Sequence, residues 1–401
     1  MRNGHGSPRI LYVTRIWPRE CGAHVRSLNI LRGLQQIGNV DVVGLNHVES
    51  ASNPDSFSEF KIAYSFDFTL SPNRGLSDKI RWTVDPKRLY PNGFAVEDEA
   101  VSGILSRLTS FDLIWFSTIH AADMFPVTIW PNSVLDIDDL QSSHGRTSLK
   151  VQRHPWERFL ALRKISVWKR REKLLGQRFT LLSTCSEEDQ RYLMRIGVQI
   201  PVHVIPNGFE RPAAEPVRNP GDPPRIGFIG FCEYRPNRDG IQWFVDQCWP
   251  RVKAAVPDAR LRLVGKGSDG IRTPTGLDVD SLGWVPDPSD EIRTWSAMVV
   301  PVRLGAGTRI KIAQAFSQKC PVISTSLGAY GYGAVNGYDI FLADTATAFS
   351  DACIRAIREP RVATELAERA WCRFLDHWTW DAVRPKVWAA VEECLRMRIS
   401  V

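Results

Sequence analysis

The segment from residue 301 to residue 314 carries residue types that could bind an anion. Gly305 and Gly307 let backbone N–H groups approach a bound group closely, and Arg309 and Lys311 follow with two positive charges. A helix predicted to begin here would direct the positive end of its dipole to the same place. The pattern indicates a diphosphate site, and the alternative interpretation is a flexible loop whose basic residues are solvated.

Glycine-containing turns also follow three other apolar runs in the second half of the chain. Such a turn can bring backbone N–H groups to a phosphate, although glycine after a strand often serves only the geometry of the turn. The candidate residues in these turns are Gly230, Arg235 and Asn237, then Gly265 and Lys266, and finally Trp284 and Val285.

Short apolar runs separated by helix-length segments predict parallel sheets with crossover helices in both halves of the chain. The repeated pattern predicts an α/β protein with two Rossmann-like, doubly wound domains. The runs occupy residues 9–14, 40–45, 111–116 and 133–137 in the first half and residues 225–230, 260–265, 298–301 and 321–324 in the second.

A proline-rich stretch from residue 206 to residue 224 separates the two series and is expected to be a linker. We therefore expect an N-terminal domain over residues 1–205, a second domain over residues 206–378, and a last helix over residues 379–401. Because ligands of open parallel sheets bind at the carboxyl ends of the strands, we expect the two domains to face a cleft that holds the site.

The composition is that of a soluble globular chain. Its 401 residues are 43% hydrophobic and 24% charged, and a formal net charge of +7 favours anionic partners. The eight cysteines are scattered without a C-x-x-C spacing, which predicts neither a zinc site nor a disulfide framework. With no long apolar run and no leader-like N-terminus, we expect a cytoplasmic protein, and no nucleic-acid partner is expected.

Residues 146–178 combine eleven Lys or Arg with only two acids, Glu157 and Glu172. Apolar residues recur every three or four positions, so we expect a basic amphipathic helix. One interpretation is a solvated basic face on a helix whose apolar side packs into the first domain. The other is docking on an anionic membrane surface, which would make the protein peripheral at the inner membrane face.

The second half resembles the donor-binding domain of family-four glycosyltransferases, which are retaining enzymes of the GT-B fold. The resemblance rests on residues 305–311 (GAGTRIK) and on the run CPVIST that ends at Thr325. Some of the supporting motifs are also similar to those of bacterial exopolysaccharide sugar transferases. The supporting motifs are SEED at 186–189, IPNG at 205–208, YRPN at 234–237, WF at 243–244 and WD at 380–381.

The resemblance implies transfer of a sugar from a nucleoside diphosphate donor to a glycan or lipid-linked acceptor. The anomeric configuration would be retained, and neither a metal nor a separate cofactor would be needed. Arg309 and Lys311 would stabilise the departing diphosphate, and the base would lie near Trp284 and Val285. The implied donor contacts are completed by the other turn residues named above, together with Ala306, Thr308 and Gln314.

Gln314 is the main departure from that family, which usually has glutamate at this position and another glutamate seven residues earlier. The family's second carboxylate accepts hydrogen bonds from both ribose hydroxyls, whereas a glutamine also presents an NH₂ donor. We therefore expect ribose binding to rearrange or weaken. Gly305 or Ala306 stands near the earlier position, as in a subset of the family with a glycine-rich loop.

Residues of the first half are candidates for contact with the reacting sugar and with the acceptor. Many members of the resembled family place a histidine just after the strand that ends here near Phe116; Ser117 fills that position and His120 follows. His120 is therefore a candidate catalytic residue, with a surface histidine as the alternative. The acceptor contacts implied by the resemblance are Gly22, His24 and Arg26.

Asp136 and Asp138 are two carboxylates on one predicted strand, and alternation would direct both the same way. Carboxylates at this spacing hold a divalent metal in another class of glycosyltransferase. They lie in the first half, however, and the diphosphate segment already has cations of its own, so no metal is expected. The preferred interpretation is a role in orienting loops at the strand end or in acceptor contact.

Two other functions remain open from the sequence. A degenerate GT-B protein that acts as a non-catalytic partner or binding subunit would account for Gln314, and a sugar-nucleotide epimerase would use the same fold. The preferred prediction is a glycosyltransferase of the hexosyltransferase type in polysaccharide biosynthesis.

Overall fold

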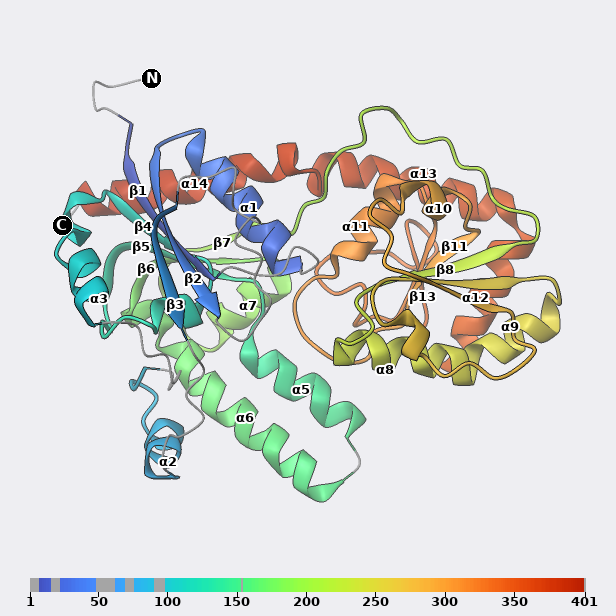
Figure 1. Ribbon diagram of the computed structural model, residues 1–401, viewed down its shortest axis with the longest axis horizontal. Helices are drawn as coiled ribbons and strands as arrows, with labels where there is room; N and C mark the ends of the chain where they lie inside the picture. The colour runs from blue at the N-terminus through green and yellow to red at the C-terminus, as the bar shows by residue number, and fades with distance from the viewer. Residues whose placement is uncertain are drawn as a thin grey trace. The chain divides into compact units, whose positions relative to one another are not determined.

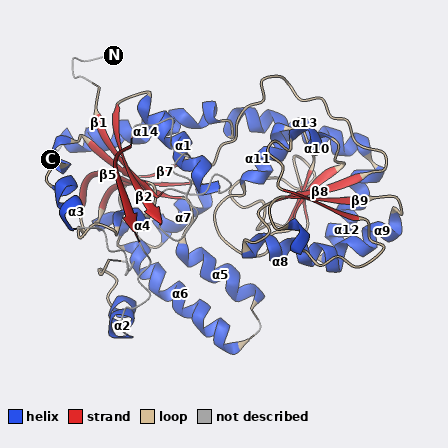
Figure 2. Cartoon of the chain, in the orientation of Figure 1, coloured by secondary structure: helices blue, strands red, loops and turns tan. Residues whose placement is uncertain are grey.

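The computed structural model describes residues 7–15, 22–47, 62–68, 76–89, 98–152 and 154–399. The chain divides into two compact units, each shown in Figure 1 and, coloured by secondary structure, in Figure 2. The first unit comprises residues 1–145, 159–205 and 383–401, and the second comprises residues 146–158 and 206–382.

A parallel sheet forms the centre of the first unit. Within the described ranges it has seven strands in the order β3-β2-β1-β4-β5-β6-β7, and every adjacent pair is parallel. The succession of strands reverses between β1 and β4, which is the switch point of a doubly wound fold. The strands are β1 (Arg9–Arg15), β2 (Asn39–His47), β3 (Ile62–Phe68), β4 (Leu113–Phe116), β5 (Trp130–Ile137), β6 (Phe179–Thr184) and β7 (Val202–Val204).

Helices lie on both faces of this sheet, and the helices listed next belong wholly or partly to the first unit, since residues 146–158, which fall in two of them, are assigned to the second. They are α1 (Gly22–Gln35), α2 (Leu76–Val84), α3 (Asp98–Leu105), α4 (Ile119–Ala122), α5 (Gln141–Val151), α6 (Pro155–Lys173), α7 (Glu187–Arg195) and α14 (Trp380–Ile399), with 3₁₀ turns at Leu108–Ser110 and Leu175–Gln177. Leu11 and Val13 of β1 pack into one buried cluster with residues of α3, α4 and α7. On the opposite face, the Tyr12 hydroxyl donates to the carbonyl of Ser27 on α1 at 3.0 Å. The two faces follow from the alternation of side chains along a strand.

A second parallel sheet forms the centre of the second unit. Its described strands follow the order β10-β9-β8-β11-β12-β13, and each adjacent pair is parallel. The succession reverses between β8 and β11, so this sheet has its own switch point. The strands are β8 (Arg225–Ile229), β9 (Arg260–Val264), β10 (Val279–Gly283), β11 (Ala297–Val300), β12 (Val322–Ser324) and β13 (Phe341–Leu342).

The second sheet separates two apolar cores. Ala297 and Val299 of β11 belong to one, and Met298 and Val300 belong to the other. Figure 1 shows α8, α9 and α12 on one side of the strands and α10 and α11 on the other. The helices are α8 (Arg235–Trp243), α9 (Trp249–Ala255), α10 (Ser289–Arg293), α11 (Ile310–Ser317), α12 (Ala346–Arg358) and α13 (Pro360–His377), with a π-helical turn at Phe244–Cys248 and a 3₁₀ turn at Ser268–Gly270.

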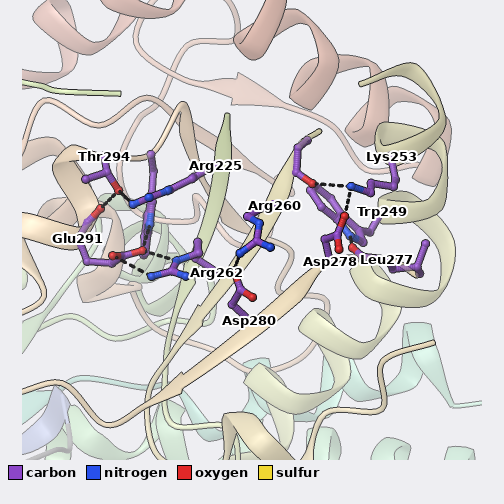
Figure 3. Close-up of polar contacts among 12 residues, drawn as sticks. Arg225, Trp249, Lys253, Arg260, Arg262, Leu277, Asp278, Asp280, Glu291 and Thr294 are labelled. Carbon is purple, nitrogen blue, oxygen red and sulfur yellow. Dashed lines mark hydrogen bonds and ion pairs between the residues drawn. The ribbon is translucent and has the colours of Figure 1, made fainter. Parts of the chain in front are cut away.

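Charged side chains along β9 and β10 are paired across the strands (Figure 3). Arg262 Nε lies 2.7 Å from Glu291 Oε1 of α10, and its Nη1 lies 3.0 Å from Asp280 Oδ2 of β10. Lys253 of α9 pairs with Asp278 at the start of β10. These pairs tie the edge strand β10 to the helices on both sides of it.

The two parallel α/β units confirm the predicted fold class. The stretch from residue 206 to residue 224 has no helix or strand beyond an isolated bridge between Phe209 and Thr379. The sequence did not predict β3, β6, β7 or β13 as strands. None of the helices in the described ranges combines the length and apolar composition needed to cross a bilayer.

Gly227 of β8 offers a test of the packing in the second unit. A Cβ at this position would lie 1.9 Å from Cδ2 of the buried Trp295 ring. We expect Gly227→Ala to lower the free energy of unfolding by about 1–3 kcal/mol or more, measured by urea denaturation. Gly103→Ala on α3 is the control, since a Cβ there meets nothing within 4 Å. Equal stability of the two variants would contradict this packing.

Candidate functional site

The glycine turns predicted to bind an anion lie at the switch point of the second sheet. Strand β8 ends at Ile229 and leads into Gly230, while the adjacent strand β11 ends at Val300 and leads through residues 301–309 into α11. Because both strands are parallel, these two segments leave the sheet at the same edge. Open α/β sheets bind ligands at this position.

Lys311, in the first turn of α11, joins the two segments. Its Nζ donates to Asn237 Oδ1 of α8 at 2.9 Å and lies 4.3 Å from the centre of the Phe228 ring of β8. A Cβ at Gly230 would lie 2.7 Å from Lys311 Nζ, so glycine leaves room for the ammonium group. The structure therefore brings Lys311 to Gly230 and Asn237, which the sequence predicted in a different turn.

The environment of Lys311 disfavours its charge. Burial lowers the pKa of its ammonium group to about 7, with the nearby Arg309 cation acting in the same direction. The neighbouring Cys232 thiol has a pKa that burial raises to about 11, so it is neutral near pH 7. An anion bound next to Lys311 would supply the opposite charge that the site lacks and would favour the protonated amine.

The glycine loop before α11 is held by its own arginine. Gly305 and Gly307 have φ angles of 102° and 71°, a region that glycine adopts without strain. Arg309 Nη1 donates to the carbonyls of Ala306 and, at 2.7 Å, Gly307, and its backbone carbonyl accepts from the Tyr332 hydroxyl at 2.9 Å. In this structure the Arg309 guanidinium thus lies against the loop carbonyls and fixes the loop conformation.

Two further side chains of the second unit hold the same loop. Thr147 Oγ1 donates to the carbonyl of Gly305 at 3.0 Å and accepts from its N–H at 3.2 Å. Asn207 Nδ2 donates to Thr308 Oγ1 at 2.9 Å. No sequence motif pointed to Thr147, whereas Asn207 belongs to the IPNG motif at 205–208.

The turn after β9 closes against the turn after β8. Gly265 has a φ of 130°, and a Cβ there would lie 2.1 Å from the carbonyl oxygen of Gly230. The N–H of Gly230 donates to Val264 O at 2.9 Å, and that of Gly265 donates to Gly283 O at 2.7 Å. The ends of β8, β9 and β10 are therefore connected by backbone hydrogen bonds, and only glycine fits at position 265.

The other predicted donor residues lie around these turns. Arg235 is the first residue of α8 and is exposed, as is the Lys266 side chain. Trp284 is 59% exposed after the end of β10, whereas Val285 packs against the core on the α11 side. Gln314 is half-buried on α11, one turn beyond Lys311.

The first unit contains a cavity of about 180 Å³ beside the ends of β4 and β5. Its lining includes two of the predicted residues, Arg26 and His120, together with Ser117, Asp138 and Trp168. The Ser117 hydroxyl is buried and has no hydrogen-bond partner among the described residues. A polar group inside the cavity could therefore bond to it.

Arg26 is part of a buried ion pair. Its Nε and Nη2 donate to the two carboxylate oxygens of Asp136 at 2.9 and 2.7 Å, and its Nη1 donates to the carbonyl of Ile205 at 2.9 Å. Ser183 also donates to Asp136, at 2.6 Å. The ion pair connects α1, β5, β6 and the residue that follows β7, so Asp136 orients chain segments. An acceptor contact by Arg26 stays a prediction.

His120 lies in the first helical turn after β4, where its ring meets Trp168 edge-on with 6.2 Å between centroids. Burial lowers its pKa to about 4, so the imidazole is neutral near pH 7. His24 is buried on α1, whose first residue is the exposed Gly22. Asp138 accepts from the Cys185 thiol at 3.3 Å. Across the described ranges, no three His, Cys, Asp or Glu side chains are grouped as metal ligands.

Comparison with known proteins identifies the domain that carries the glycine turns. Residues 223–359 match the family described as Glycosyl transferases group 1. This match supports the prediction that the chain is a transferase. A protein of Klebsiella pneumoniae, described as an uncharacterized 44.6 kDa protein in the cps region, is 25% identical over 154 residues. That alignment covers 36% of this chain and 40% of the relative, well under half of its length.

Solved glycosyltransferase structures share the fold of the whole chain. Anabaena HepE in complex with UDP and glucose has a TM-score of 0.63 at 14% identity and covers 96% of this chain and 100% of its own. Sucrose-phosphate synthase from Thermosynechococcus elongatus has a TM-score of 0.67 at 15% identity, with 97% and 100% coverage. WaaG, a glycosyltransferase involved in lipopolysaccharide biosynthesis, has a TM-score of 0.58 at 10% identity, with 97% and 99% coverage.

The Arg26–Asp136 pair gives a stability prediction. Removing one partner leaves an uncompensated buried charge, so we expect Arg26→Met to lower the free energy of unfolding by about 3–5 kcal/mol. Arg191→Met on α7 is the control, because the Arg191–Glu187 pair is exposed and should contribute at most about 1 kcal/mol. Urea denaturation measures both. Similar losses in the two variants would show that the buried pair has no special role.

Proposed function

We propose that this chain is a retaining, metal-independent glycosyltransferase that moves a sugar from a nucleoside diphosphate donor to a glycan or lipid-linked acceptor. The bond between the anomeric carbon and the diphosphate oxygen breaks, and its electron pair stays with the diphosphate. The acceptor oxygen bonds to the same carbon on the same face, and the hydroxyl proton passes to the departing diphosphate. The matched group 1 domain and the GT-B neighbours support the transferase class. The UDP and glucose bound to HepE support a nucleotide-sugar donor.

The observation that carries the proposal is the placement of Lys311 at the switch point of the second sheet. Its ammonium group is held by the neutral Asn237 amide and the Phe228 ring, beside the glycine loop whose N–H groups precede α11. A departing diphosphate gains negative charge during transfer, and a positioned cation stabilises that charge without a metal. The Arg309 guanidinium, which donates to loop carbonyls in this structure, would instead donate to phosphate oxygens and so supply a second cation.

The cavity in the first unit is the proposed acceptor pocket. The Ser117 hydroxyl and the neutral His120 imidazole are groups that can bond to sugar hydroxyls, and Trp168 offers an aromatic wall. Two similar proteins favour a surface polysaccharide or glycolipid acceptor. The Klebsiella relative is described as lying in the cps region, and WaaG is involved in lipopolysaccharide biosynthesis.

Substitution of the two cations tests the proposal. We expect Lys311→Ala and Arg309→Ala each to lower kcat for sugar transfer by about 10²–10³-fold, measured as release of the nucleoside diphosphate. Arg251→Ala is the control, because exposed Arg251 pairs with Asp351 on the outer helices of the same unit. Unchanged transfer by Arg309→Ala, together with no binding of uridine, guanosine or thymidine diphosphate in calorimetry, would refute the proposed function.

Lys311 also predicts a pH dependence of diphosphate binding. Its pKa of about 7 in the free protein should rise when an anion binds, so the affinity should fall as the pH increases above 7, by up to about tenfold per unit. Lys311→Arg keeps its charge throughout this range and removes the contribution of the amine. Calorimetry with uridine diphosphate between pH 6 and about 9 compares the two proteins. Parallel pH profiles would show that Lys311 does not titrate on binding.

A further inference from the structure

Helix α6 exposes large apolar side chains, and two of them, Phe159 and Leu160, belong to the apolar side that one interpretation of the sequence packed into the first domain. Phe159 and Leu162 are each 53% exposed, and Leu160 is 41% exposed. The residues that α6 buries are instead Ala161, Val167, Trp168, Arg171 and Glu172. Because residues three apart lie on one side of a helix, Phe159 and Leu162 form part of a continuous exposed strip.

Helix α2, which lies beside α6, exposes further apolar residues. Ile80 and Val84, one helical turn apart, are 54% and 66% exposed. Arg163 Nη2 of α6 donates to Thr83 Oγ1 at 2.5 Å, and Arg170 Nη2 donates to Thr83 O at 3.0 Å. The two helices are thus neighbours in the first unit. We call Ile80, Val84, Phe159, Leu160 and Leu162 the α2–α6 surface.

Buried contacts of Arg171 and Trp168 join α2 to α6. The buried Arg171 guanidinium donates to the carbonyls of Trp82 at 2.6 Å and Asp85 at 2.9 Å, and it lies 4.1 Å from the centre of the Trp82 ring. Trp82 in turn packs edge-on against Trp168, with 5.7 Å between ring centroids. These contacts hold α2 against the buried side of α6.

Basic side chains flank the apolar residues. The exposed charges of α6 are Arg158, Arg163, Lys169, Arg170 and Lys173, against the single acid Glu157, and Asp85 is exposed after the end of α2. Lys169 and Lys173 are four residues apart, so both lie on the same side of the helix, beyond Leu162. An apolar strip next to a basic one suits the boundary between acyl chains and anionic headgroups.

We propose that the α2–α6 surface docks on an anionic phospholipid bilayer, with Phe159, Leu162 and Val84 inserted among the headgroups. A second copy of the chain is the disfavoured occupant, because a twofold contact through this surface would bring the two basic strips together. Docking of this kind would place the transferase at the surface where a lipid-linked acceptor is available. Docking on a bilayer requires neither the donor nor the acceptor, so the docking proposal can be refuted or supported independently of the proposed function.

The test is sedimentation of the full chain with two kinds of vesicle, phosphatidylcholine alone and phosphatidylcholine with phosphatidylserine. We expect binding to the second kind at low salt and release as the Debye length falls toward about 3 Å near 1 M salt. The Phe159→Ser and Leu162→Ser substitutions should each weaken binding by about tenfold. Lys169→Gln with Lys173→Gln should weaken it by about fivefold per charge removed.

Matched controls on α7 separate docking from general effects. Met194 is 61% exposed, so Met194→Ser removes a comparable apolar group, and Arg191→Gln with Arg195→Gln removes two exposed charges. These variants should bind vesicles like the unaltered chain. Urea denaturation of every variant checks that the unit stays folded.

Three results would overturn the proposal. The first is binding that does not depend on phosphatidylserine, and the second is equal loss of binding in the α6 and α7 variants. The third is sedimentation equilibrium without lipid that shows a dimer abolished by Leu162→Ser, because this would identify a second copy as the occupant.

Discussion

The central interaction of the candidate site is that of a buried lysine held without an acidic partner among the described residues. Lys311 sits at the carboxyl end of a parallel sheet, and the partners that hold its ammonium group, an amide oxygen and an aromatic ring, carry no negative charge of their own. Burial without a counterion is unfavourable for a cation, and this is why its pKa falls to about 7. Two of the nearby glycines follow from packing around this lysine: Gly230 leaves room for the ammonium group, and Gly265 leaves room for the carbonyl of Gly230.

The buried cation of the first unit, Arg26, has an acidic partner. Arg26 is neutralised by Asp136 through two hydrogen bonds, and a third goes to the carbonyl of Ile205. This ion pair is complete within the protein, and its role is to hold the strand ends in place. The contrast separates two kinds of buried cation: Arg26, which has a carboxylate partner within the protein, and Lys311, which is held by an amide oxygen and an aromatic ring.

The local motifs could be predicted from the sequence, whereas their contacts could not. The segment from Gly305 to Lys311 is recognisable because glycine, arginine and lysine at a helix start all favour one kind of ligand. Its contact with Asn237 joins residues 74 positions apart, and that of Thr147 with Gly305 joins residues 158 apart. Thr147 has a common residue type and bonds to backbone, so nothing in the pattern marks it. The apolar side of α6 was predicted only in part: Trp168 is buried, whereas Phe159 and Leu160 are exposed and Val167 is buried in addition.

The last helix has a consequence for how the chain is made. Residues 383–401 belong to the first unit, where the indole N–H of Trp388 donates to the carbonyl of Gly33 and Glu393 lies 2.6 Å from His203. Val383, Val387 and Val391 are buried along one side of that helix. During synthesis, residues 1–205 leave the ribosome long before this helix does. The apolar face of the first unit that the helix covers therefore stays exposed until the second unit has been synthesised. A stop codon anywhere in the second half would therefore damage the first.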